Sequence, residues 1–212
     1  MNAKKMNKML KSTVAVLSVV LVICLSVAGT LTYLQDKTTP VVNTFSPSNI
    51  DLDLTETPVG IGGTATANTY KMIPGVDLSK DPVVDVTADI DCYVFVKVEE
   101  SDNFDNFMTY AIAGGWKLYG SGETDDEAGI DTDTEDEYIL YREVTAAAAQ
   151  GGASFEVLAG NVVTVKSTVT KGDMEGLGTD YPKLTLTAYA IQKTGFESNL
   201  AGAWNAAQAQ QG

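Results

Sequence analysis

The densest set of groups that could do chemistry is the acidic segment ETDDEAGIDTDTEDE, residues 123–137, with nine carboxylates in 15 residues. Ca²⁺ prefers several such oxygen ligands. The run DTDTED begins with the spacing of an EF-hand loop, but its sixth position is Asp136 where that loop needs glycine, and its twelfth is not glutamate. Two interpretations remain open: a solvated hairpin tip, or a weak Ca²⁺ site with Asp131, Asp133 and Glu135 as ligands.

The chain contains no histidine, which excludes Ser-His-Asp and Cys-His catalysis and every zinc site built on imidazole. Carboxylate pairs such as Glu99-Glu100 and Asp51/Asp53 are expected to be exposed charges on strand faces. We therefore expect no catalytic residue, no enzyme activity, and no cofactor other than the weak Ca²⁺ site. The aromatic residues of the central region favour core or cross-strand packing over a sugar-binding platform; these are Tyr110, Trp116, Tyr119 and Tyr141.

The N-terminus has the features of an export signal. A lysine-rich start is followed by 15 uncharged residues, Val14–Ala28. A signal-peptide apolar region spans about 7–15 residues and a membrane-spanning helix about 20. Ser26 and Ala28 are small residues at the positions that a signal peptidase requires, which predicts a cut before Gly29. Extended to Leu34, the tract could instead stay as a membrane anchor, so both outcomes are kept.

Removing the leader changes the charge of the chain. Four of the 14 basic residues lie in it, while all 28 acidic residues follow it, so the mature chain has 10 basic and 28 acidic groups and a net charge of −18. Such a field repels nucleic acid and anionic membrane surfaces. We expect a secreted, cell-surface protein that contacts membrane only through its N-terminal segment. Cys92 alone remains after cleavage, and DCYVFVKV predicts a buried thiol there.

Beyond Thr38 the apolar residues alternate with a period of two, which indicates strands. NIDLDLTE places Ile50, Leu52 and Leu54 on one face, and CYVFVKVEE is apolar on both faces, as in a central strand covered from both sides. Further strands are expected at the segments that follow: YKMI, ending in a Pro-Gly turn; PVVDVTAD; two short strands about Gly114-Gly115; and residues 137–144, 154–158, 161–170 and 183–192.

Helix is scarce in this pattern. Single turns are expected at FDNFM and TKGDMEGLG, and FESNLAGAWNAAQAQ predicts a short amphipathic C-terminal helix with Ser198 as its N-cap, packed on an edge or end of the sheets. The predicted fold is all-β: an antiparallel, jelly-roll-like β-sandwich over residues 50–212 with a short C-terminal helix. Residues 1–33 are the signal or anchor, and residues 34–49 an extended N-terminal segment.

The leader is followed by Gly29-Thr30, Asp36 and Asn43-Thr44-Phe45 leading into a strand, and later by YKMIPGVDLSKDPVVDV with its Pro-Gly turn. These residues resemble the exported TasA/camelysin family of Gram-positive bacteria, and the last segment is similar to that family's I-x-P-G-x-x-x-x-K turn. The resemblance implies a dedicated signal peptidase and, in fibre-forming members, a jelly-roll subunit that donates its N-terminal segment as a strand to the next subunit. A family-like cut would fall before Leu34, so the expected cleavage region comprises Ser26, Ala28, Gly29, Thr32, Tyr33 and Leu34.

The segment KTTPVVNTF suits strand donation. Its alternation places Val41, Asn43 and Phe45 on one face and Val42 and Thr44 on the other. An extended peptide that adds to an open sheet edge gains main-chain hydrogen bonds, and a head-to-tail contact of this kind builds filaments. The expected function is thus a self-associating subunit of a biofilm-matrix fibre. The alternatives are pairing of this segment within its own subunit, a non-polymerising adhesin or Ca²⁺-responsive module, and a camelysin-type metallo-endopeptidase.

Overall fold

The computed structural model describes residues 10–21, 48–60, 62–120 and 136–209. The chain divides into two units, Met1–Ser46 and Pro47–Gly212. In the first unit, residues 10–21 form a helix with exposed apolar side chains such as Leu17 and Leu21. Among the described residues, no helix has both the length and the apolar character needed to cross a membrane.

The second unit is all-β, with three antiparallel sheets ordered β1-β3-β8, β10-β4-β7-β6 and β2-β9-β5. The strands are β1 (Ile50–Thr55), β2 (Asp77–Ser79), β3 (Val83–Ala88), β4 (Cys92–Glu100), β5 (Met108–Thr109), β6 (Lys117–Leu118), β7 (Glu137–Val144), β8 (Ala153–Glu156), β9 (Val162–Val165) and β10 (Leu184–Gln192). The helices are α2 (Phe104–Phe107), α3 (Ala146–Ala149), η1 (Ala159–Asn161), α4 (Lys171–Gly176) and α5 (Leu200–Ala209).

The two three-stranded sheets are joined by backbone hydrogen bonds into one layer. The amide of Lys80 donates to the Asn161 carbonyl at 2.9 Å, and the Val157 amide donates to the Pro82 carbonyl at 3.0 Å. β2 and β3 thus follow each other as one interrupted strand, and β8 and β9 as another, broken by η1. This layer has the order β1, β2/β3, β8/β9, β5, and it faces the four-stranded sheet.

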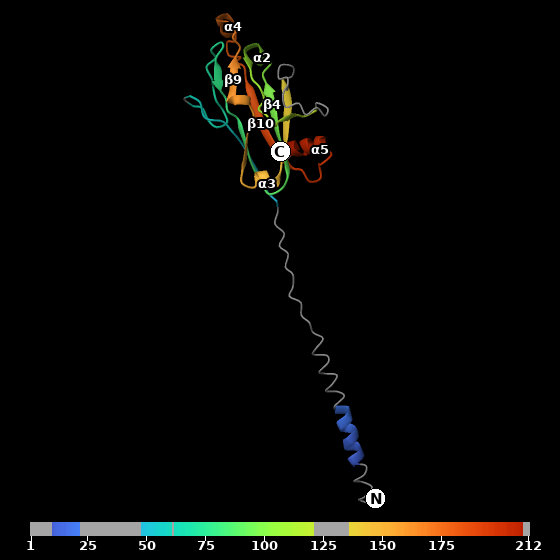
Figure 1. The fold of residues 1–212 in the computed structure, drawn as a ribbon. Coiled ribbons are helices and arrows are strands. Elements are labelled where there is room, and N and C mark those ends of the chain that lie inside the picture. The colour runs from blue at the N-terminus through green and yellow to red at the C-terminus, as the bar shows by residue number, and fades with distance from the viewer. Residues whose placement is uncertain (1–9, 22–47, 61, 121–135, 210–212) are drawn as a thin grey trace, which may run out of the picture. The chain divides into compact units, whose positions relative to one another are not determined.

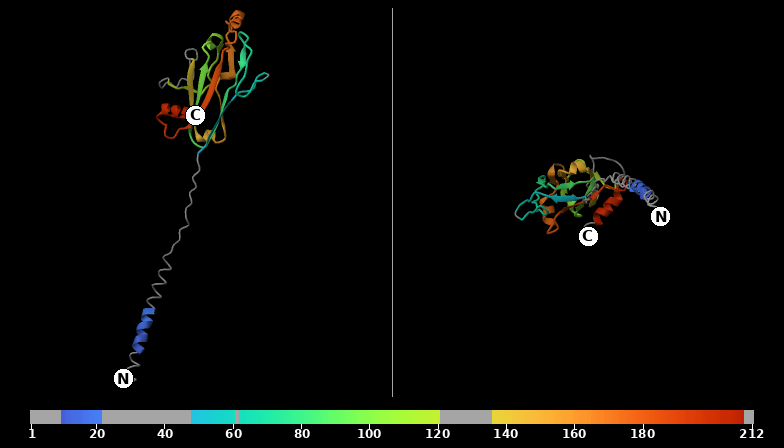
Figure 2. Two further views of the ribbon diagram at one scale, coloured as in Figure 1. Left: turned by 180° about the vertical axis from the view of Figure 1, so that it is seen from behind. Right: turned by 90° about the horizontal axis from the view of Figure 1, so that it is seen from below.

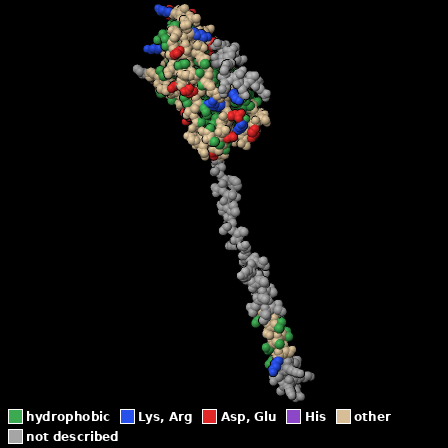
Figure 3. Space-filling view, in the orientation of Figure 1, with side chains coloured by type: hydrophobic (Ala, Val, Ile, Leu, Met, Phe, Trp, Pro, Cys, Tyr) green, Lys and Arg blue, Asp and Glu red, His purple; other side chains and the backbone are tan. Residues whose placement is uncertain are grey.

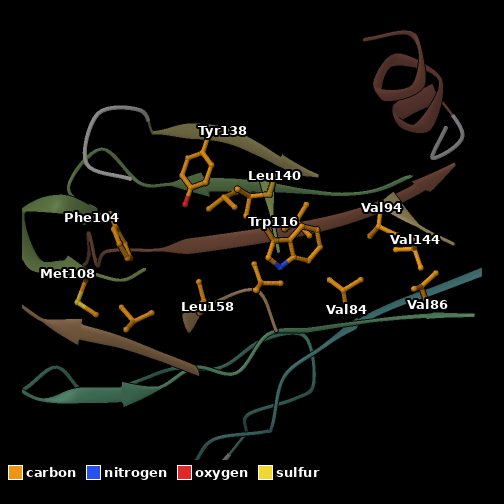
Figure 4. Packing of buried hydrophobic residues seen from close by; sticks show 14 of the residues in the cluster. Val84, Val86, Val94, Phe104, Met108, Trp116, Tyr138, Leu140, Val144 and Leu158 are labelled. Carbon is orange, nitrogen blue, oxygen red and sulfur yellow. The ribbon is translucent and has the colours of Figure 1, made fainter. Parts of the chain in front are cut away.

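The main core lies between the two layers (Figure 4). Val84 and Val86 of β3 point toward Val94 of β4 and Leu140 of β7, and the indole of Trp116 reaches into the middle of this set. All five side chains are at most 1% exposed. The alternation predicted for β1 is confirmed, because Ile50, Leu52 and Leu54 pack against this core.

β4 is the central strand that its double-sided apolar pattern predicts. It pairs with β10 on one side and with β7 on the other. Cys92 and Val94 contribute to the main core, while Tyr93 and Phe95 point to the other face of the sheet and belong to a second cluster. The buried thiol expected at Cys92 is confirmed, and burial raises its pKa to about 11.

The second cluster is covered by α5, which lies on the face of the four-stranded sheet and not on an edge or end as expected. Trp204 packs its ring against Tyr189 and Phe95, with ring centres 5.0 and 5.3 Å apart. The N-cap is also different from the expected Ser198: the Asn199 side chain accepts a hydrogen bond from the Gly202 amide at 2.9 Å. An Asn at this position satisfies an amide of the first helical turn in the way that a serine would.

One strand prediction is wrong, and another is confirmed with partners that the sequence did not show. YKMI forms no strand; the chain from residue 70 reaches the turn at Pro74-Gly75 without a ladder, and the strand follows as β2. The two short strands expected about Gly114-Gly115 are confirmed as β5 and β6. β5 pairs with β9 and β6 with β7, so the two strands belong to different layers. The helix α3, capped by the Thr145 side chain, was not predicted.

The folded unit has two distinct ends (Figures 1 and 2). α2, α4 and the turn before β2 lie at one end, and α3 lies at the other with the start of β1. β3 begins nearer the α4 end, at Val83, and finishes at the α3 end, at Ala88. β1 runs in the opposite direction, from the α3 end toward the α4 end, because Ile50 pairs with Ala88 and Thr55 with Val83. β10 runs the opposite way, since Leu184 pairs with Glu100 and Gln192 with Cys92.

Candidate functional site

The candidate site is a seam between the edge strands β1 and β10. Each belongs to a different layer, the two strands lie next to each other, and no ladder joins them. Within the described part of the chain, β1 pairs only with β3, and β10 pairs only with β4. An edge strand presents backbone groups to which another strand can be added.

The seam is apolar, and the side chains that line it are half-buried. β1 contributes Ile50, Leu52 and Leu54, and β10 contributes Leu184 and Leu186. These side chains pack against the main core, yet none reaches the near-complete burial of Val94 or Leu140 in the strands behind them. Covering them with another apolar strand would remove further apolar surface from water. Each Å² of apolar surface covered would stabilise the complex by roughly 25 cal/mol.

On the opposite side of the sandwich, side chains and a chain crossing connect the two layers. There the chain crosses from β5 to β6, and Trp116 donates its indole N–H to the Glu156 carbonyl at 2.8 Å. The Arg142 guanidinium lies 4.0 Å from the ring centre of Phe155 and 4.8 Å from that of Trp116. Its Nε donates to the Gly115 carbonyl at 3.2 Å, so a cation stacked on two aromatic rings links the crossing chain to both layers.

Extended peptide is the ligand class that the seam suits best. β10 is nine residues long, and so is the segment Lys37–Phe45. A strand of that length spans about 30 Å, enough to run beside all of β10. Because side chains of a strand alternate between faces, one set could fill the seam while the other stays at the surface.

A buried polar cluster lies between the layers near α2. The Tyr110 hydroxyl donates to the Glu100 carboxylate and is hydrogen-bonded to the Tyr138 hydroxyl. Glu100 is only 9% exposed, so the prediction of an exposed charge is wrong for this residue. It faces the core because it continues the alternation of Val96 and Val98 on β4. Burial, above all, raises the pKa of both tyrosines, which keeps these phenols neutral and able to donate.

A second polar network holds the loop between β1 and β2. Glu56 forms an ion pair with Lys80, and both side chains are largely buried. The Asn68 amide donates to Glu56 at 3.2 Å, and Tyr70 donates to it at 3.4 Å. Burial, followed by the charges of Glu56 and Asp81, raises the pKa of Tyr70 to about 12. This network fixes the loop and brings no reactive groups together in a cleft.

The site residues predicted from the sequence lie outside the described residues, so these predictions stay untested. This holds for the cleavage region Ser26, Ala28, Gly29, Thr32, Tyr33 and Leu34, for the candidate donor strand Val41, Val42, Asn43, Thr44 and Phe45, and for the Ca²⁺ ligands Asp131, Asp133 and Glu135. Among the residues that the structure does describe, no cluster of three metal-ligating side chains is present.

The aromatic residues expected to pack in the core or across strands do so. Trp116 is 1% exposed, Tyr119 contacts Trp204 with ring centres 6.3 Å apart, and Tyr141 contacts Phe95 at 6.3 Å. Sequence reasoning missed the seam residues Leu184 and Leu186 as a site. Their alternation identified a strand, but no signal in the sequence marked that strand as an edge.

Comparison with known proteins adds no assignment. No protein-family model matches the chain, and no curated protein or solved structure matches it. The resemblance to the TasA/camelysin family therefore stays a prediction from the residues themselves.

Proposed function

We propose that this chain is an exported structural subunit of an extracellular, biofilm-matrix-type protein fibre, in which the N-terminal segment of one copy adds as a strand to the next. It has no catalytic role in this proposal. The observation that carries it is the half-buried apolar seam between β1 and β10, the outermost strands of two facing sheets. The first residues of β1 connect directly to the proposed donor segment, residues 34–49.

The strand pairing supports a jelly roll as the architecture of this subunit. In a jelly roll of eight strands, a long antiparallel hairpin is wound so that strands 2 and 7, and 3 and 6, pair. Counting β2/β3 and β8/β9 as one strand each, the second strand pairs with the seventh through β3 and β8, and the third with the sixth through β4 and β7. The first and the eighth, β1 and β10, lie side by side without a ladder.

A donor strand fits this gap in one direction. In a filament of identically oriented copies, the chain enters each folded unit at the α3 end, where β1 begins, so this end must face the α4 end of the next copy. Phe45 of the donor would then lie near the α4 end of the accepting copy and Lys37 nearer its α3 end. That direction is antiparallel to β10, and a donor there extends the four-stranded sheet by one strand.

Export is supported by the lysine-rich start, the apolar run and the small residues Ser26 and Ala28. The charge of −18 left after cleavage suits a soluble secreted precursor, because like-charged copies repel until a specific contact forms. The resemblance to fibre-forming exported proteins points the same way.

The test is electron microscopy of the secreted mature protein, after N-terminal sequencing has identified the cut, with and without Ca²⁺. We expect filaments from the mature chain and none from a variant that lacks Lys37–Phe45. A synthetic peptide KTTPVVNTF should bind this deletion variant and raise its Tm, whereas a control peptide with aspartate in place of Val41 and Phe45 should not.

Stable monomers under every condition would refute the fibre. They would favour the second candidate, a surface adhesin or Ca²⁺-responsive module that acts through its loops. Filaments that persist without Lys37–Phe45 would refute strand donation, and failure of the peptide to bind would show that the seam does not accept this segment.

A further inference from the structure

The turn before β2 exposes apolar side chains at the α4 end. In the described part of the second unit, three large hydrophobic residues are strongly exposed: Ile73 at 56%, Val76 at 40% and Tyr181 at 57%. All three belong to segments at the α4 end, since Val76 bonds to the end of β9 and Tyr181 precedes β10. Ile73 and Val76 share one turn, and exposed apolar side chains that lie together mark an interaction surface more often than scattered ones do.

The turn is held rigidly in place. The Val76 amide donates to the Ile73 carbonyl at 3.1 Å, and Gly75, with a φ of 74°, takes the left-handed position that follows proline in a type II turn. The Gly75 amide donates to the Val165 carbonyl at 2.9 Å, and the Val165 amide donates back to Val76 at 3.1 Å. The exposed side chains are thus presented by an anchored backbone, which lowers the entropy lost on binding.

The opposite end has a surface of complementary character. There α3 and the residues after it, Ala146–Gly152, read AAAAQGG, with Ala147 and Ala148 exposed. Small uncharged side chains let another backbone approach closely and offer methyl groups to a branched aliphatic side chain. Figure 3 shows both basic and acidic side chains at the α4 end of the visible face, where Lys171 forms an ion pair with Glu175, and the turn at the α3 end carries Asp89 and Asp91.

We infer that the 73–76 turn is an end-to-end contact that docks on the α3 end of the next copy of this chain. The inference rests on the proposed function, because head-to-tail strand donation places these two ends against each other. A second copy is the occupant because the proposed donor segment directly precedes β1, which begins at the α3 end. A copy that accepts this segment therefore has to lie against the α3 end of the donating copy. The docked ends fix the angle between copies, and the donated strand supplies most of the affinity.

The test compares filament assembly of mature chains that differ at the two ends. The variants are Ile73→Asp with Val76→Asp at one end, and Ala148→Asp at the other. The matched control, Asn205→Asp with Gln208→Asp, adds two negative charges at exposed positions of α5, on the outer face of the four-stranded sheet. Circular dichroism and Tm verify that each variant folds, and sedimentation gives the critical concentration for assembly.

We expect both end variants to raise the critical concentration by about tenfold or more, the range for losing a buried contact at an interface, and the control to change it little. The donor-deleted form of the Ile73/Val76 variant should still bind the peptide KTTPVVNTF, because the seam is intact. Assembly of the end variants at the control's critical concentration would overturn the contact while leaving strand donation standing. Monomers from the unaltered chain would refute the proposed function and this contact with it.

Discussion

Replacing Trp204 by alanine should destabilise the folded unit strongly. The side chain is 5% exposed, and its ring centre lies 5.0 Å from that of Tyr189 and 5.3 Å from that of Phe95. Truncating a buried tryptophan costs about 3–5 kcal/mol, and aromatic pairs of this geometry contribute about 0.5–1.5 kcal/mol each to it. α5 has ten residues, too few to stay helical in water once its anchor is removed.

The assay uses the fact that the chain has two tryptophans. After Trp204→Ala, the fluorescence of Trp116 reports the main core alone, because that ring is 1% exposed between the layers. Urea unfolding followed by this signal should give a free energy of unfolding lower by about 3–5 kcal/mol. Far-UV circular dichroism should show helix signal lost at lower urea than the Trp116 signal.

The control for this experiment is Asn205→Ala, an exposed position on the same helix. It should change the free energy of unfolding by less than about 0.5 kcal/mol. A loss of less than about 1 kcal/mol for Trp204→Ala would refute the reasoning, because it would mean that the second apolar face of β4 needs no helix to cover it.

Three more predictions concern buried or opposed polar groups. Tyr110→Phe should lower the free energy of unfolding by about 1–3 kcal/mol, since the Glu100 carboxylate loses a donor inside the core; urea titration measures it. The free energy of unfolding should hold its full value below about pH 10 and fall above it, because tyrosines in the unfolded chain ionise near pH 10. Burial keeps the pKa of Tyr110 and Tyr138 raised in the folded state. A Tm that stays constant up to about pH 11 would contradict this prediction. Asp53→Asn should raise stability by about 0.2–1 kcal/mol at low salt, because Asp53 lies opposite Asp85 across the β1–β3 ladder, and added salt should shrink the gain.

Much of the local structure could be predicted because alternation is a local property. Glu137–Val144 was predicted as a strand with the bounds that β7 has, and the double-sided pattern of Cys92–Val96 identified the central strand. What alternation cannot show is which layer a strand joins. The two strands about Gly114-Gly115 separate into different layers because each finds its partner far along the chain, β9 for one and β7 for the other.

The candidate site could not be predicted from the sequence, because alternation does not show which strands pair. Leu184 and Leu186 read like any half-buried strand, and only the strand order reveals that β10 is an edge next to β1. Glu100 was misassigned because its charge suggested the surface, while its register on β4 places it on the core face beside Val98. There the Tyr110 hydroxyl, which is itself hydrogen-bonded to Tyr138, donates to the carboxylate and compensates for its burial. No local sequence pattern identifies these two tyrosines as neighbours of Glu100.

The position of β1 has a mechanical consequence. Tension on the N-terminal segment would act on Ile50 and pull β1 along its own axis against β3. All six paired positions from Ile50↔Ala88 to Thr55↔Val83 would then be loaded at once, in shear. A ladder pulled from its end perpendicular to the strands would open one hydrogen bond at a time and yield at far lower force. The fold thus resists a lengthwise load with the stronger of the two geometries, as the proposed fibre subunit would require.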